Sequence, residues 1–124
     1  KLIKDLEKKA DFSSHITTHA LDTSIGIPAN GMLITLKSFC DNQWQPLSVG
    51  ITNADGRISD ILPPGQLLSP AIYTMTFNTS RYYKSKNQNG FYPEVSIQFE
   101  VKDTNHYHVP LLINPYGYST YKGS

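Results

Sequence analysis

The four histidines of this chain are its most promising chemical groups, and they fall in two short segments. His15 and His19 lie four residues apart in one segment, and His106 and His108 lie two apart in the other. If each segment is a β-strand, both spacings place the side chains of a pair on one face. Imidazoles titrate near neutral pH, so two converging histidine faces would form a proton-transfer site. For any single histidine, ordinary surface polarity is the better interpretation, and only the clustering favours chemistry.

The spacing of His106 and His108 on a strand also fits a zinc site, with His19 as a third ligand. No acidic residue directly flanks these histidines, so the sequence offers no obvious group to orient such ligands. The zinc interpretation therefore ranks below both proton transfer and plain surface polarity.

Arg57 follows Asn-Ala-Asp-Gly (53–56), a turn that would present its guanidinium at the start of a short strand. Such a group can orient or polarise a carbonyl-rich substrate through two parallel hydrogen bonds. The alternative is a solvated arginine after a hairpin turn, which would be the better interpretation of Arg57 on its own.

Covalent catalysis has little support in the sequence. Cys40 has no neighbouring base or cationic pattern and ends a predicted strand, which favours a buried structural thiol. The serines lack the Gly-x-Ser-x-Gly elbow, and no phosphate-binding, dinucleotide or metalloprotease motif is present. Direct attack by water is the simpler chemistry.

Short strands are the elements that must position these residues, because turn residues interrupt the β-rich pattern at short intervals. The cleanest alternation is in 94–102, where Val95, Ile97, Phe99 and Val101 share one face. Segment 57–62 is a candidate edge strand, and 78–90 breaks the pattern and indicates a short helix with a loop. About eight strands in roughly 110 residues predict an all-β, antiparallel sandwich. The other strand candidates are 15–21, 32–39, 41–52, 71–77, 106–113 and 118–121.

Composition narrows the class of protein. The 124 residues suit one domain, and the net charge of +1 gives no electrostatic case for a nucleic-acid partner. No apolar run approaches the roughly 20 residues that a membrane helix needs. One cysteine allows no internal disulfide. Residues 1–12 are charge-rich and interpreted as a tail or linker stub, and 13–124 as the domain.

The C-terminal run from His106 to Ser124 is unusual for a chain end, since most termini carry little pattern. Tyr116, Tyr118 and Tyr121 offer contact area between punctuating prolines and glycines. A purely structural interpretation is a last strand whose tyrosines fill a subunit contact.

Five segments together resemble the transthyretin-like family of 5-hydroxyisourate hydrolases. They are HITTHALDTSIGIPANG (15–31), TNADGR (52–57), FYPEVSIQF (91–99), HYHVPLL (106–112) and YKGS (121–124). The first contains the His-x-Leu-Asp core at His19, Leu21 and Asp22, and the last is usually Tyr-Arg-Gly-Ser in the family. The resemblance covers about residues 13–124.

This resemblance implies a prealbumin-like sandwich of about eight strands with one short helix. It also implies hydrolysis of 5-hydroxyisourate to 2-oxo-4-hydroxy-4-carboxy-5-ureidoimidazoline in urate degradation. Carried over by position, the catalytic residues are His19, Arg57 and His108, and the substrate-binding residues are Tyr121, Lys122, Gly123 and Ser124. Lys122 departs from the usual arginine, keeping the charge but losing the planar fork. The implied assembly is a homotetramer with sites at the subunit interface, without a metal or organic cofactor, in cytoplasm, peroxisomes or periplasm.

Two other functions compete with hydrolysis. Transthyretin, the thyroid-hormone carrier, shares the fold but keeps neither the His/Arg set nor the C-terminal tetrapeptide. A plain interaction module would use the tyrosines and histidines only as an interface. The joint presence of His19, Arg57, His108 and YKGS favours the enzyme.

Overall fold

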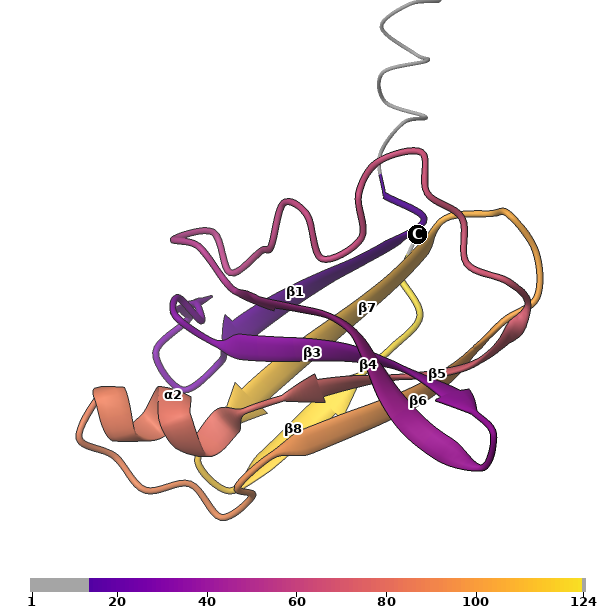
Figure 1. The fold of residues 1–124 in the computed structure, drawn as a ribbon. Coiled ribbons are helices and arrows are strands. Elements are labelled where there is room, and N and C mark those ends of the chain that lie inside the picture. The colour runs from indigo at the N-terminus through magenta and orange to yellow at the C-terminus, as the bar shows by residue number, and fades with distance from the viewer. Residues whose placement is uncertain (1–13, 124) are drawn as a thin grey trace, which may run out of the picture.

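The computed structural model describes residues 14–123 of the chain and shows a sandwich of two four-stranded sheets with one helix in that range (Figure 1). Residues 1–12, predicted to be a tail or linker, and Ser124 lie outside the described residues. The first sheet contains β1 (Ile16–Asp22), β2 (Ile27–Pro28), β7 (Tyr107–Asn114) and β8 (Gly117–Thr120). The second contains β3 (Leu33–Cys40), β4 (Gln43–Ile51), β5 (Ala71–Phe77) and β6 (Val95–Val101). Helix α2 (Thr79–Ser85) connects β5 to the loop before β6.

The strand order is β2-β1-β7-β8 in one sheet and β4-β3-β5-β6 in the other. All pairings are antiparallel except that between β1 and β7, which run parallel. The predicted sandwich of eight strands and one short helix is thus confirmed. The parallel pair matters for the site, because it places the two histidine segments side by side.

The core lies between the sheets and follows the alternation read from the sequence. In β6, Val95 and Val101 are buried, while Ser96, Gln98 and Glu100 are exposed. Residues of the parallel pair alternate in the same way, with Ile16, Thr18 and Ala20 buried between partly exposed neighbours. The largest fully buried apolar side chains come from both sheets, from α2 and from two loops: Ile16, Met32, Ile34, Leu36, Ile61, Met75, Phe77, Tyr82, Leu111 and Ile113. Within residues 14–123 no helix has the length and apolar character that a bilayer crossing requires.

Two local predictions are wrong. Segment 57–62 forms only an isolated bridge at Arg57, because Ile58, Ile61 and Leu62 all turn into the core and this spacing does not alternate. Cys40 is exposed and not buried, because β3 runs beyond the core there into a hairpin turn. Asp41 and Asn42, both with positive φ, make that turn.

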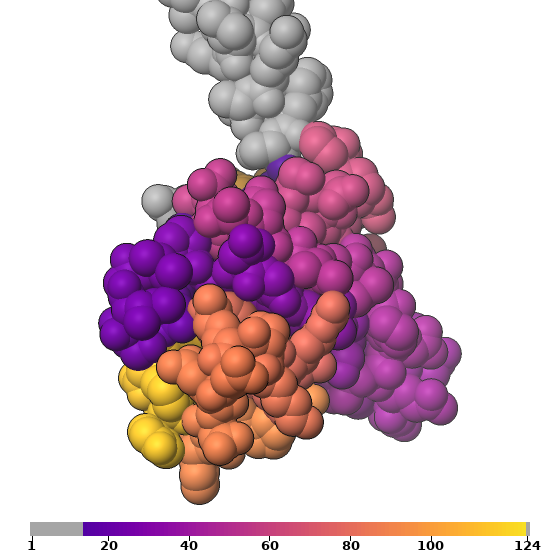
Figure 2. Space-filling view, turned by 90° about the vertical axis from the view of Figure 1, so that its left-hand side faces the viewer, coloured from indigo at the N-terminus to yellow at the C-terminus, as the bar shows by residue number. Residues whose placement is uncertain are grey.

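Helix α2 is tied to the end of β1 through a buried carboxylate. The Tyr82 hydroxyl donates to Asp22 Oδ2 at 2.8 Å, and the backbone N–H and hydroxyl of Ser24 donate to Oδ1. Asp22 is fully buried, so these donors replace the water that the carboxylate has lost. In the space-filling view the orange surface, which includes α2, lies against the indigo surface of the N-terminal part of the described chain (Figure 2).

Replacing Tyr82 with phenylalanine should lower the free energy of unfolding by about 1.5–3 kcal/mol, since it removes a donor from a buried charged group. Tyr83→Phe is the matched control. The Tyr83 hydroxyl is the one buried side-chain polar atom without a partner in the described part of the chain. Its removal should be neutral or stabilising. Urea unfolding of both variants checks the pair, and equal destabilisation would contradict the role given to Tyr82.

Candidate active site

His19 lies on β1 beside a turn that covers the strand's free edge. The Ala20 N–H donates to the Gly56 carbonyl at 2.9 Å, and Arg57 bridges to His19 in antiparallel fashion. The His19 ring donates from Nε2 to the Asp55 carbonyl at 2.8 Å, because a carbonyl can only accept. Neutral His19 therefore carries its free electron pair on Nδ1.

Gly56 allows this close approach. Its φ is +75°, and a Cβ there would overlap the Ala20 carbonyl oxygen and come within 3.2 Å of His19 Cδ2. Asn53 Oδ1 holds the turn by accepting from the Asp55 and Arg57 N–H groups. The predicted Asn-Ala-Asp-Gly turn thus brings the Arg57 backbone directly beside His19.

His108 lies on β7 in register with Thr17 of β1, and a hydrogen bond of 2.8 Å joins the Thr17 hydroxyl to His108 Nδ1. Since His19 follows Thr17 by two residues on the same strand, His19 and His108 are diagonal neighbours on one face of the sheet. The predicted convergence of the two histidine segments is therefore present for these two residues.

The electrostatic surroundings of His108 favour its neutral form. Burial lowers the pKa of His108 from the ordinary value of 6.5, and the nearby charges of Arg57, His106 and His19 lower it further. A hydrogen bond between the His108 ring and the Thr17 backbone opposes the shift. A neutral imidazole close to a guanidinium is able to accept a proton near neutral pH.

The C-terminal segment runs back along β7 and contacts His108. The Gly123 N–H donates to the His108 carbonyl at 2.9 Å, and the two residues form an isolated bridge. A Cβ on Gly123 would come within 2.5 Å of His108 Cδ2 and 2.9 Å of His108 Cβ. Only glycine therefore fits between this segment and the imidazole.

Gly123→Ala should lower the kcat/KM of a reaction that uses His108 about 100-fold. The added Cβ would overlap the imidazole, so either His108 or the terminal segment must move out of place. Gly117→Ala is the matched control, since a Cβ there meets only the Asn114 side chain at 3.6 Å, an ordinary contact. Steady-state kinetics of the two variants separate a local effect from a general one. Similar kinetics for both would show that the packing of Gly123 on His108 is unimportant.

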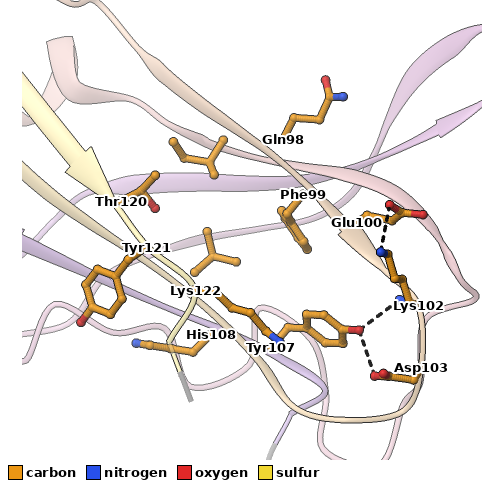
Figure 3. A pocket seen from close by; sticks show the side chains of 12 residues that line it. Gln98, Phe99, Glu100, Lys102, Asp103, Tyr107, His108, Thr120, Tyr121 and Lys122 are labelled. Atoms are coloured by element: carbon orange, nitrogen blue, oxygen red, sulfur yellow. Dashed lines mark hydrogen bonds and ion pairs between the residues drawn. The ribbon is translucent and has the colours of Figure 1, made fainter.

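A cavity of about 530 Å³ opens beside His108, between β6 and the C-terminal segment. Its lining includes His108, Tyr121 and Lys122 but neither His19 nor Arg57 (Figure 3). The Lys122 amine lies 5.3 Å from the centroid of the Tyr107 ring, whose hydroxyl donates to Asp103 Oδ1 at 2.9 Å. Asp103 has a lowered pKa, mainly through this bond from Tyr107 and with a small contribution from Lys122.

His15 does not join the other histidines. It lies in a bend before β1, is buried, and packs edge-on against Tyr107, which faces the core. Its Nε2 donates to the Asp103 carbonyl at 3.0 Å, and its Nδ1 accepts from the Leu68 N–H at 3.1 Å. The predicted sharing of a face with His19 fails because the strand alternation begins only after the bend.

Sequence reasoning missed two kinds of residue here. Thr17 bridges His106 and His108, and its position two residues before His19 was the available signal. Gly56 was noted only as part of a turn, and Gly123 only as a substrate-binding residue implied by the resemblance, although each packs against a histidine ring. His19, His106 and His108, the three histidines considered as zinc ligands, do not form a metal-binding cluster. Residues 14–123 contain no group of three or more His, Cys, Asp or Glu side chains that could hold a metal ion.

The sequence model of the HIUase/Transthyretin family matches residues 16–123, which include His19, Arg57, His108 and Gly123. The chain belongs to the HIUase/Transthyretin family. Within it, the 5-hydroxyisourate hydrolase of Mus musculus is 44% identical over 116 residues, covering 90% of this chain and 97% of the mouse protein.

Solved structures agree with this family membership. The 5-hydroxyisourate hydrolase of Klebsiella pneumoniae superposes with a TM-score of 0.77 at 32% identity, covering 88% of this chain and 98% of that one. A crystal structure of (S)-allantoin synthase has a TM-score of 0.79 at 33% identity over 88% of this chain. This chain spans only 43% of the length of that synthase.

Proposed function

We propose that this chain is a hydrolase of 5-hydroxyisourate, acting in urate degradation. The observation that carries the proposal is the gathering of His19, Arg57 and His108 on one face of the β1–β7 pair, in a family whose named relatives include this hydrolase. The product is 2-oxo-4-hydroxy-4-carboxy-5-ureidoimidazoline. No metal or organic cofactor enters the proposal.

The proposed reaction is the addition of water to the ring amide. A histidine takes one proton from water as the oxygen bonds to the carbonyl carbon, and the carbon–nitrogen bond then breaks. The same proton passes to the departing ring nitrogen, so the site returns to its starting charge. His19 and His108 share this task, since each, when neutral, presents a ring nitrogen free to accept a proton.

Arg57 is proposed to bind the substrate's carbonyl oxygens and to stabilise the negative charge that develops during water attack. Its guanidinium is exposed, and its charge acts on His108. The same charge therefore serves two purposes, since it also keeps His108 in the neutral form that accepts protons.

The terminal residues Tyr121, Lys122, Gly123 and Ser124 are proposed to close the pocket around the substrate. Tyr121 and Lys122 line the cavity beside His108, and Gly123 packs directly on it. The Lys122 amine lies over Tyr107, so lysine in place of the family's usual arginine still anchors this segment. The role of Ser124 rests on the resemblance alone.

A homotetramer with sites at the subunit interface is proposed for the assembly. His19 and Arg57 lie on an open face of the single chain, whereas amide hydrolysis benefits from a site that excludes bulk water. The strands β6 and β8 end their sheets, and Phe91 and Tyr116 are 71% and 79% exposed, which is surface suited to partner subunits. Native mass spectrometry tests the subunit number. A cytoplasmic or peroxisomal location stays an expectation from the resemblance.

Product identification tests the function against the carrier and interaction-module alternatives. Carbon-13 NMR of freshly made 5-hydroxyisourate should show faster appearance of the ureidoimidazoline product when the protein is present. A carrier would leave this rate unchanged and would instead bind thyroid hormone in calorimetry. An interaction module would do neither.

A further inference from the structure

Three hydrogen bonds link Ser14, His106, Thr17 and His108 in one line across the start of β1 and β7. His106 Nδ1 lies 2.7 Å from the Ser14 carbonyl oxygen, and His106 Nε2 lies 2.9 Å from the Thr17 hydroxyl. The same hydroxyl lies 2.8 Å from His108 Nδ1. The two imidazoles are nearly parallel, with ring planes 15° apart.

The direction of this line follows from its first member. A backbone carbonyl can only accept, so the hydrogen of neutral His106 must be on Nδ1. His106 Nε2 then has a free electron pair and accepts the one hydrogen of the Thr17 hydroxyl. Having used that hydrogen, Thr17 can only accept from His108, so the hydrogen of neutral His108 is on Nδ1.

The His108 nitrogen left without a hydrogen is Nε2, because the bond to the Thr17 hydroxyl uses the hydrogen on Nδ1. We propose that Thr17 and His106 are positioning residues that hold His108 in its Nδ1–H tautomer, so that Nε2 takes the proton from the attacking water. This inference rests on the proposed function and deepens it, because it assigns the accepting atom and the groups that fix it.

Local structure makes the line rigid. Thr17 and His108 are register partners in the parallel pair, and threonine is restricted at χ1 because it is β-branched. Ser14 is buried, and its hydroxyl bonds to the backbone of Ile16, which fixes the accepting carbonyl. A rotation of His108 would break its bond to Thr17 and move the ring against Gly123.

Thr17→Val tests the proposal, because valine keeps the shape of threonine and removes the hydroxyl. Nitrogen-15 NMR of the histidine rings, without any substrate, should show His108 mainly as the Nδ1–H tautomer in the wild type and a mixture in Thr17→Val. Turnover of 5-hydroxyisourate should fall about tenfold in kcat with little change in KM, less than the loss expected when the base itself is removed. Thr17→Ser restores the hydroxyl and should recover both readouts.

A second pair of variants tests the line at His106, should Thr17→Val fail to fold. Asparagine at this position can still donate to the Ser14 carbonyl but has no acceptor near Thr17, so His106→Asn should give the tautomer mixture and the kcat loss. Glutamine places an amide oxygen near the position of Nε2, so His106→Gln should be closer to wild type. An unchanged His108 tautomer in Thr17→Val or His106→Asn would overturn the proposal. Failure of hydrolysis in the wild type, with the tautomer shift intact, would count against the proposed function only.

Discussion

Replacing His108 with asparagine is expected to lower kcat for 5-hydroxyisourate at least about 100-fold, the lower range of general-base effects. The reason is that asparagine has no titratable nitrogen, while its size and polarity allow β7 to keep its pairing with β1. His108 is partly buried and its pKa is lowered by burial and by Arg57, so it is suited to be neutral when water attacks. Steady-state kinetics with freshly made substrate provide the measurement.

His19→Asn is the companion variant, and a loss of similar size is expected because the two histidines share water activation. Circular dichroism and thermal unfolding serve as the fold control for both. Near-normal turnover in both variants would contradict the assignment of the histidines. A large loss in His108→Asn alone would instead leave His19 with a binding role.

Arg57→Gln is expected to lower kcat/KM by roughly 100-fold or more, the usual cost of removing a group that stabilises an oxyanion. It should also change the pH profile. Because the positive charge of Arg57 lowers the pKa of His108, its removal raises that pKa. A base works only when deprotonated, so the acid limb of kcat/KM, expected below pH 6.5 in the wild type, should move to higher pH in the variant.

Arg57→Lys separates the two effects. Lysine keeps the charge, so the acid limb should stay near its wild-type position. It loses the planar fork, so kcat/KM should still fall. An acid limb that does not move in Arg57→Gln would show that Arg57 has no electrostatic effect on the catalytic base.

Much of the fold follows from local pattern. The alternation of Val95, Ile97, Phe99 and Val101 needs one buried face, and β6 provides it. The parallel pairing of β1 with β7 was not accessible, because it joins segments about 90 residues apart and strand periodicity carries no partner information. The edge strand predicted for 57–62 is wrong for a related reason, because the apolar residues of this segment pack around a bend and not along a strand.

The residue types of the site could be predicted from the sequence, but its geometry could be predicted only in part. The histidine segments and the turn before Arg57 could be recognised from spacing, and the family resemblance pointed to the same residues. The contribution of Thr17 depends on the register of two distant strands, which places its hydroxyl between two imidazoles. The prediction that His15 shares a face with His19 is wrong because of one bend, which turns the His15 ring toward Tyr107 and the core.

The central claim is that His19, Arg57 and His108 form a site that hydrolyses 5-hydroxyisourate. Its most direct test is the ultraviolet decay of freshly made 5-hydroxyisourate, followed with no protein, with the untagged wild type and with His108→Asn. With such a site, the decay should accelerate in proportion to wild-type concentration and return nearly to the spontaneous rate with the variant. A wild-type decay no faster than the spontaneous one, from folded protein, would contradict this claim.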